Sequence, residues 1–498
     1  MGDPSSESRA LRQVARGGSL NLAGSGVAAL AGLALTWVVA RGLPQAEAGV
    51  FFAATSLFLI LEAAAQVGGD TSLPMFLPRL RADGRVGRIR AVVRLATTLT
   101  LGVGTVLGLG LLLLAIFDFD VADESQSGPW LVLLLALALP AAALGNVFLA
   151  GTRAFFRIRP TVLIEKLGKN LGQLAFVALG TVTGSLLWVT AGWLLPVALV
   201  VVPAALVLRR LIGGTQDVGE HPGDAQPLTP EYLAYTLPRA FARLLQMVLQ
   251  RADIVVVAAI LSPTEAAIYA VATRLIVLGQ LAAASVQQVL APQMAHLISE
   301  HAWASTLRVG RIAAGWTMLL VWPLYLLCIA IGPVLLDVIG GPDYVVGAST
   351  LAILACGMLV GAASGPVDTI LLMSGHSVAS LVNMIVAVAV NLSLLFALTP
   401  TYGIAGAAVA WSAAIIIRSL LGVAMVKYWA RGTAFGLPSL TAGAMAIVMF
   451  FVIPWLLIRN HVTLDWAVTV VVGACVLGYA GLAWLFRKQL HLRAFANR

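Results

Sequence analysis

Long apolar runs alternate with short polar breaks along almost the whole chain. Most runs hold about 20 or more residues, the length at which an α-helix crosses a hydrocarbon core about 30 Å thick. A helix also satisfies its own backbone polar groups, which lipid cannot do. The runs predict fourteen membrane-spanning helices, over residues 19–40, 48–69, 92–117, 129–151, 161–183, 185–208, 236–260, 265–291, 306–331, 346–373, 377–399, 404–426, 438–458 and 464–486.

The longest polar break separates the sixth predicted span from the seventh. It reads RRLIGGTQDVGEHPGDAQPLTPEYLAY and is rich in the Gly, Pro and Asp that mark loops. We therefore expect an N-terminal six-helix bundle over 1–208, a cytoplasmic linker over 209–235, a second six-helix bundle over 236–427, and two extra helices with a cytoplasmic tail over 428–498.

The two halves contain a related segment where their first and second spans join. LPQAEAGVFFAATSLF at 43–58 aligns without gaps on LSPTEAAIYAVATRLI at 261–276, with Leu, Glu, Ala, Thr and Leu at shared positions. Internal repeats of this kind are typical of transporters. An even number of spans separates the copies, so the repeat is parallel. Ser56 of the first copy is replaced by Arg274 in the second.

Basic residues predict the orientation in the membrane. Of the 31 Lys and Arg residues, all but five lie in loops or span ends on the side of the N-terminus. Cytoplasmic loops are enriched in these residues, so both ends are expected to be cytoplasmic in a multi-pass protein of the inner (plasma) membrane. The acidic segment 118–128 then faces outside. The five exceptions are Arg41 and Arg459 on the outer side and Arg251, Arg274 and Arg418 within spans.

Composition narrows the class of protein. The chain has 498 residues, 60% of them hydrophobic and 11% charged, against roughly 25% charged in soluble domains. Its net charge of +9 is spread over short loops with no aromatic-lined basic patch, so we expect no nucleic-acid partner. There is no CxxC, Cys/His cluster or GxxxxGK[ST] motif, and no long loop with paired carboxylates. We therefore predict no metal site, no catalytic residues and no enzymatic activity.

Several stretches carry a family resemblance. They are RADIVVVAAILSPTEAAIYAVATRL at 251–275, VLAPQMAHL at 289–297, TYGIAGAAVAWS at 401–412 and the first two spans from NLAGSG onward. Their order and spacing resemble the polysaccharide transporters (O-antigen and oligosaccharide flippases) of the multidrug/oligosaccharidyl-lipid/polysaccharide exporter superfamily. The residues that fit are Asp253, Tyr269, Ala272, Arg274 and Pro292, whereas Ala267 replaces the usual Gly.

The resemblance implies an all-α fold of two pseudo-symmetric six-helix bundles around a central cavity, plus two C-terminal helices. It implies a flippase that moves a polyprenyl-diphosphate-linked oligosaccharide to the outer leaflet for cell-surface polysaccharide assembly. Expected partners are that substrate, membrane lipids and a polymerase or glycosyltransferase. No cofactor is expected, although transport could be coupled to H⁺ or Na⁺.

Charged residues within or beside the spans are the candidate site residues, because a charge at the bilayer centre costs roughly 2.5–3.5 kcal/mol on insertion scales. Arginine suits a diphosphate, since its fork binds phosphate oxygens in pairs. Asp253 is expected to pair with Arg274 rather than with Arg251, which lies on another helix face. The substrate-binding candidates are Arg274, Arg251, Arg239, Arg243, Arg41 and Arg418. The ion-coupling or ion-pair candidates are Asp253, Glu62 and Asp368.

Two alternatives remain open at the sequence level. An ion-coupled antiporter of drugs or cationic metabolites would require acidic residues in its cavity, and acids and bases within the spans are nearly balanced here. A lipid II flippase would share the helix count, although the cluster of arginines usual in its first bundle is not evident. Structural roles also remain open for individual charges, such as an i,i+4 salt bridge between Glu165 and Lys169.

Overall fold

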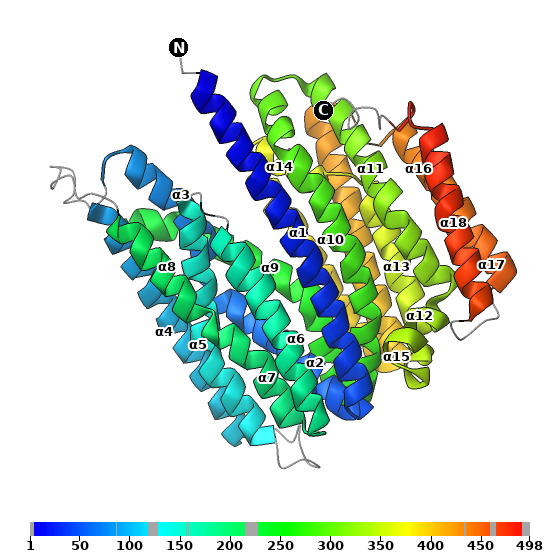
Figure 1. Ribbon diagram of the computed structural model, residues 1–498, viewed down its shortest axis with the longest axis horizontal. Helices are drawn as coiled ribbons and strands as arrows, with labels where there is room; N and C mark the ends of the chain where they lie inside the picture. The colour runs from blue at the N-terminus through cyan, green and yellow to red at the C-terminus, as the bar shows by residue number, and fades with distance from the viewer. Residues whose placement is uncertain are drawn as a thin grey trace. The chain divides into compact units, whose positions relative to one another are not determined.

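The structure of the protein is a computed structural model. It describes residues 4–85, 87–117, 128–155, 157, 159–214, 228–432, 435–458 and 465–490. Every regular element within these ranges is a helix (Figure 1), which confirms the predicted all-α class. The acidic residues 118–127, residues 215–227 of the predicted linker, Arg459 and the tail from 491 lie outside the described residues.

The helices are consistent with fourteen spans. Within the described residues, 11 helices are long and apolar enough to cross a membrane. One of them, α15 (Ser377–Ala430), covers two predicted spans, because the chain stays helical on both sides of Gly403 with its non-helical φ of 59°. The remaining two predicted spans correspond to α9 (Leu228–Ile260) and to the consecutive helices η1 (Thr161–Lys169) and α6 (Asn170–Val182).

The chain forms two compact units, and the divisions between them fall between α1 and α2, inside α2 and inside α9. Unit 1 comprises Met1–Leu43 and Ala54–Ala252, and unit 2 comprises Pro44–Ala53 and Asp253–Arg498. The domain limits given by the sequence stay a prediction.

In unit 1, α3, α4, α7 and α8 pack against α5, whereas α6 packs against α1 and α7; Figure 1 shows α4, α5, α7 and α8 side by side. Leucines and Trp188 remain exposed on their outer faces, as expected of helices that contact lipid. Its elements, besides those already given, are α1 (Pro4–Gly42), α2 (Gln45–Ala65), α3 (Gly69–Ala82), α4 (Gly87–Phe117), α5 (Gly128–Ala154), α7 (Leu186–Leu199) and α8 (Val201–Gly213).

Unit 2 is centred on α11 and α13, which pack against each other, with α10 and α16 on α11 and α15 on α13. Its elements, besides α15, are α10 (Pro263–Ser299), α11 (Trp303–Ala330), α12 (Gly332–Ile339), η2 (Pro342–Gly347), α13 (Ala348–Ala363), α14 (Val367–Met373), α16 (Leu437–Ile447), η3 (Val448–Val452), α17 (Ile453–Ile458) and α18 (Trp466–Leu485).

The aligned repeat segments begin their helices at equivalent positions. α2 begins at Gln45 and α10 at Pro263, two aligned residues. At α10 the reason is local: Ser262 accepts a 3.2 Å hydrogen bond from the Glu265 backbone N–H, and Pro263 starts the first turn. The two helix starts also touch, because Gly49 packs directly against the Pro263 carbonyl group within unit 2.

Candidate functional site

The buried carboxylate of Asp253 lies at the centre of one polar site in unit 2. Its Oδ2 accepts a 2.7 Å hydrogen bond from the Tyr269 hydroxyl group, and its Oδ1 accepts one of 2.9 Å from the Ile254 backbone N–H. Asp253 is 2% exposed and Tyr269 is fully buried. Both residues belong to the segment that carries the family resemblance. Asp253 lies on α9 and Tyr269 lies on α10. The pairing of Asp253 with Arg274 stays a prediction.

Arg274 is half-buried on α10 and approaches an aromatic ring of α2. Its guanidinium carbon lies 6.0 Å from the centroid of the Phe52 ring, at the outer limit of a cation–π contact. Phe52 itself is 1% exposed and belongs to the part of α2 that packs within unit 2. The arginine that the second repeat copy carries in place of Ser56 is therefore held beside the first copy.

A second site in unit 2 joins two of the predicted residues. Arg418 donates a short hydrogen bond to Asp368, and the two form an ion pair with side chains 26% and 39% exposed. Asn383 donates a 3.0 Å hydrogen bond to the Arg418 backbone carbonyl, so it links the two halves of α15. Amide groups commonly join membrane helices in this way. Arg418 and Asp368 are therefore ion-pair partners of each other.

The remaining predicted arginines belong to unit 1. Arg41 is exposed in the last turn of α1, where a positive charge suits the helix dipole, and Arg251 is half-buried on α9. Arg239 folds back on its own helix: its guanidinium carbon lies 3.6 Å from the centroid of the Tyr235 ring, and Nη1 donates to the Tyr235 carbonyl. Arg243 instead reaches Asp70, with Nε 4.0 Å from Oδ2.

The start of α9 contacts α3 through a hydrogen bond and an ion pair. Tyr232 and Ser72 are buried with their hydroxyl oxygens 2.9 Å apart, and Arg79 pairs with Glu231 at 3.2 Å. Burial raises the pKa of the Tyr232 phenol, so the hydroxyl group stays protonated. These contacts fix the helix that carries Arg239 and Arg243.

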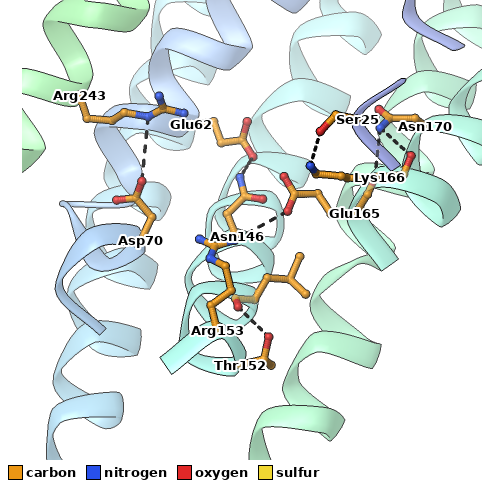
Figure 2. Close-up of polar contacts among 11 residues, drawn as sticks. Ser25, Glu62, Asp70, Asn146, Thr152, Arg153, Glu165, Lys166, Asn170 and Arg243 are labelled. Atoms are coloured by element: carbon orange, nitrogen blue, oxygen red, sulfur yellow. Dashed lines mark hydrogen bonds and ion pairs between the residues drawn. The ribbon is translucent and has the colours of Figure 1, made fainter. Parts of the chain in front are cut away.

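Glu62 lies at the centre of a charged site in unit 1 (Figure 2). Its side chain on α2 is 7% exposed, and Oε1 accepts a 2.7 Å hydrogen bond from Asn146 Nδ2 on α5. Lys169, Glu165 and Arg243 interact electrostatically with this carboxylate. Two predicted residues, Glu62 of α2 and Arg243 of α9, thus belong to the same charged site.

The π-helix η1 supplies the other charges of this site. Glu165 lies 3.9 Å from Arg153 of α5, and Lys166 donates a hydrogen bond to Ser25 of α1. The i,i+4 salt bridge of Glu165 with Lys169 stays a prediction, and the ion pair of Glu165 that the structure places is the one with Arg153. Asn170 donates to the carbonyl groups of Glu165 and Lys166 and so supports this geometry.

Sequence reasoning did not find Asn146 as the hydrogen-bond partner of Glu62 or Arg153 as the ion-pair partner of Glu165. The one available signal was a polar Asn within a predicted span. No group of three or more His, Cys, Asp or Glu residues that could hold a metal ion occurs in the part of the chain that the structure describes.

Comparisons with known proteins agree on the fold. A family model described as "Polysaccharide biosynthesis protein" matches residues 91–347. A search of curated protein sequences finds no significant match. Among solved structures, the lipid II flippase MurJ in an inward closed conformation has a TM-score of 0.70 at 14% identity, covering 94% of this chain and 98% of that one.

Two transporters of the MOP superfamily are also similar. A multidrug resistance MATE family transporter in an inward-facing conformation has a TM-score of 0.59 at 16% identity, covering 81% of this chain and 94% of that one. A transporter from Pyrococcus furiosus, whose binding pocket is described as having reverse polarity, has a TM-score of 0.53 at 16% identity, covering 84% and 94%. At these identities the likeness establishes the fold alone, whereas the family match over residues 91–347 agrees with the resemblance to polysaccharide transporters.

Proposed function

The chain belongs to the polysaccharide biosynthesis protein family, and from that premise we propose that it is a flippase for a polyprenyl-diphosphate-linked oligosaccharide. It moves this lipid from the inner to the outer leaflet for cell-surface polysaccharide assembly, by alternating access. The observation that carries the proposal is the family match together with charged side chains held within otherwise apolar, membrane-length helices.

The substrate's chemistry explains why those charges are present. A diphosphate–sugar head group is anionic and hydrophilic, so its passage through lipid requires cations that replace its counter-ions. Arg274 and Arg251 are half-buried on helices of the segment that carries the family resemblance, where they would contact the diphosphate. The substrate would meet Arg239 and Arg243 first, on the cytoplasmic side, and Arg41 last. Arg418 would act together with its ion-pair partner Asp368. The protein works in the inner membrane with both termini cytoplasmic and performs transport rather than enzymatic chemistry.

Two other cargoes are supported by particular observations. Lipid II is favoured by the TM-score of 0.70 with a lipid II flippase over 94% of the chain. A cationic drug or metabolite is favoured by the likeness to a multidrug transporter and by the buried carboxylates Glu62 and Asp253. The polysaccharide precursor is preferred because the family match is a match of sequence, whereas the structural likeness is one of fold.

The experiment is mass spectrometry of total lipids from a strain depleted of this protein and from its parent. We expect a polyprenyl-diphosphate oligosaccharide to accumulate, and the wild-type protein to clear it. Arg274→Ala should fail to clear it, while Arg210→Ala, at an exposed arginine of α8, should succeed. Accumulation of lipid II, or no accumulation with altered tolerance to cationic drugs, would replace the proposal by the corresponding alternative.

A further inference from the structure

An apolar groove lies on unit 1 where α6 and α7 pack together beside α5, and α5 and α7 run side by side in Figure 1. Its volume is about 650 Å³, and sites that bind small molecules usually measure about 300–1,000 Å³. Apart from Thr183, every residue that lines the groove is apolar or aromatic. A hydrocarbon chain therefore suits the groove better than a polar molecule does.

Small residues bring α6 and α7 into direct backbone contact at the groove. A methyl group added at Gly192 would lie 2.7 Å from the Phe176 carbonyl oxygen, and one at Gly180 would lie 2.9 Å from the Trp188 carbonyl oxygen. Large side chains project beside this contact, since Leu179 and Trp188 are 64% and 62% exposed. Glycines at the helix contact and bulky residues beside it thus produce a depression instead of a flat helix surface.

The groove lies within the membrane-spanning part of unit 1. The apolar helices Gly128–Ala154 and Leu186–Gly213 that contribute to it are long enough to cross a membrane. Its lining falls at 134–138 of α5, 176–183 of α6 and 188–198 of α7, towards the α6–α7 turn. The basic residues predict that this turn is on the outer side. Lipid hydrocarbon of the outer leaflet, rather than water, therefore surrounds the groove.

An empty groove at this depth is unfavourable. Side chains that line a void lose the dispersion contacts that a neighbouring group would give them. In a bilayer the molecules that supply those contacts are lipids, whose chains are as apolar as leucine. A chain that follows the groove restores the contacts of α5 and of the hairpin formed by α6 and α7.

The polar atoms of the lining lie at one end of the groove, beside the α6–α7 turn. Thr183 is the C-cap residue of α6, and Trp188 lies in the first turn of α7. Tryptophan is enriched at the level of the lipid head groups. The last turn of α6 contains no basic residue, so the partial negative charge of its terminal carbonyl groups favours a cation there. The arrangement suits a lipid with its chain in the groove and a positively charged ammonium group at the turn.

Charge argues against the diphosphate-linked carrier as the occupant of this groove. A diphosphate requires cations, and residues 128–152 and 170–208 contain no Lys or Arg. The basic residues that flank these segments, Arg153 and Lys169, lie at the end of α5 and before the start of α6, away from the α6–α7 turn. A zwitterionic phospholipid requires no such cations, because its own ammonium group balances its phosphate.

We propose that the groove is a structural lipid site that binds one acyl chain of a zwitterionic phospholipid, with the ammonium group of the lipid at the α6–α7 turn. The bound chain packs the α6–α7 hairpin against α5 and is a part of the folded unit 1. The site does not depend on which cargo the protein moves, so it stands or falls separately from the proposed function.

The test is native mass spectrometry of the full-length protein, delipidated in detergent and then supplied with phosphatidylethanolamine. We expect the wild type to retain one phospholipid through a further detergent wash. Ala191→Phe and Ala198→Phe should retain none, because both alanines line the groove and are partly exposed, so the added ring occupies the site of the chain. Val106→Phe is the matched control, since Val106 is 68% exposed on α4, outside the groove, and this variant should retain the lipid like the wild type.

Thermal unfolding checks that each variant is folded and gives a second readout. Phosphatidylethanolamine should raise the melting temperature of the delipidated wild type and of Val106→Phe, but not that of Ala191→Phe. A measurement on the wild type alone avoids any misfolded variant: phosphatidylethanolamine with a photoreactive acyl chain, irradiated after the wash, should label peptides of α5, α6 and α7 in preference to those of α4.

The outcomes separate this inference from the proposed function. Loss of all lipid from the washed wild type, retention by both groove-filling variants, or equal labelling of α4 overturns the site. If protein purified without delipidation instead carries a polyprenyl-diphosphate lipid that Ala191→Phe loses, the phospholipid is the wrong occupant. Accumulation of the carrier lipid in depleted cells tests the transport function alone.

Discussion

The Tyr269 hydroxyl group donates a 2.7 Å hydrogen bond to the Asp253 carboxylate, and both side chains are almost entirely buried. Tyr269→Phe removes this donor, so the buried carboxylate loses one of its hydrogen bonds. We expect it to lower the free energy of unfolding by about 1–3 kcal/mol. Reversible unfolding of the purified protein in detergent measures this.

A double-mutant cycle with Asp253→Asn tests whether the two residues are coupled. The double variant should lose less than the sum of the single losses, because the bond between Tyr269 and Asp253 is counted in both single losses and can be lost only once. Strictly additive losses would contradict a direct contribution of this hydrogen bond to stability.

Gly49 lies so close to the Pro263 carbonyl group that it has no room for a side chain. Gly49→Ala should destabilise the protein by about 1–3 kcal/mol, because overpacking forces the helix starts of the two repeat copies apart. Gly26→Ala in α1 is the matched control, since nothing lies within 4 Å of an added methyl group there. The control should be neutral or stabilising by up to about 1 kcal/mol, and equal losses in the two variants would contradict the close contact.

Arg418 and Asp368 form an ion pair, so exchanging them separates a structural role from a role in transport. Each single change, Arg418→Asp or Asp368→Arg, should lower the melting temperature because it places like charges side by side. The exchanged double variant should recover most of the loss. If Arg418 also contacts the substrate, lipid accumulation should persist in cells that carry the exchange, and full clearance would assign the pair to stability alone.

The predicted spans are helices because an apolar segment in lipid must satisfy its own backbone hydrogen bonds, and an α-helix does so. The start of α10 could also be predicted from Ser262, Pro263 and Glu265, whose capping chemistry is local. The break at Gly403 in α15 falls where the sequence places a loop, between two predicted spans.

The partners of the charged residues could not be predicted in the same way. Glu62 contacts Asn146 of a helix distant in sequence, and Glu165 contacts Arg153 of the preceding helix. The π-helix at 161–169 has no signal in apolar periodicity, so the sequence could not predict it. Tertiary packing, rather than local pattern, decides these contacts.

The orientation predicted from basic residues is open to a direct labelling test. Asp83, beside the basic end of α3, and Thr183, in the turn between α6 and α7, are both exposed. In a background without the exposed Cys356, Thr183→Cys should react with a membrane-impermeant thiol reagent added to intact spheroplasts. Asp83→Cys should react only after the membrane is permeabilised, because positively charged loops stay cytoplasmic. The opposite pattern would reverse the topology and place Arg239 and Arg243 on the exit side of the transport path, whereas labelling of both sites in intact cells would contradict the membrane topology itself.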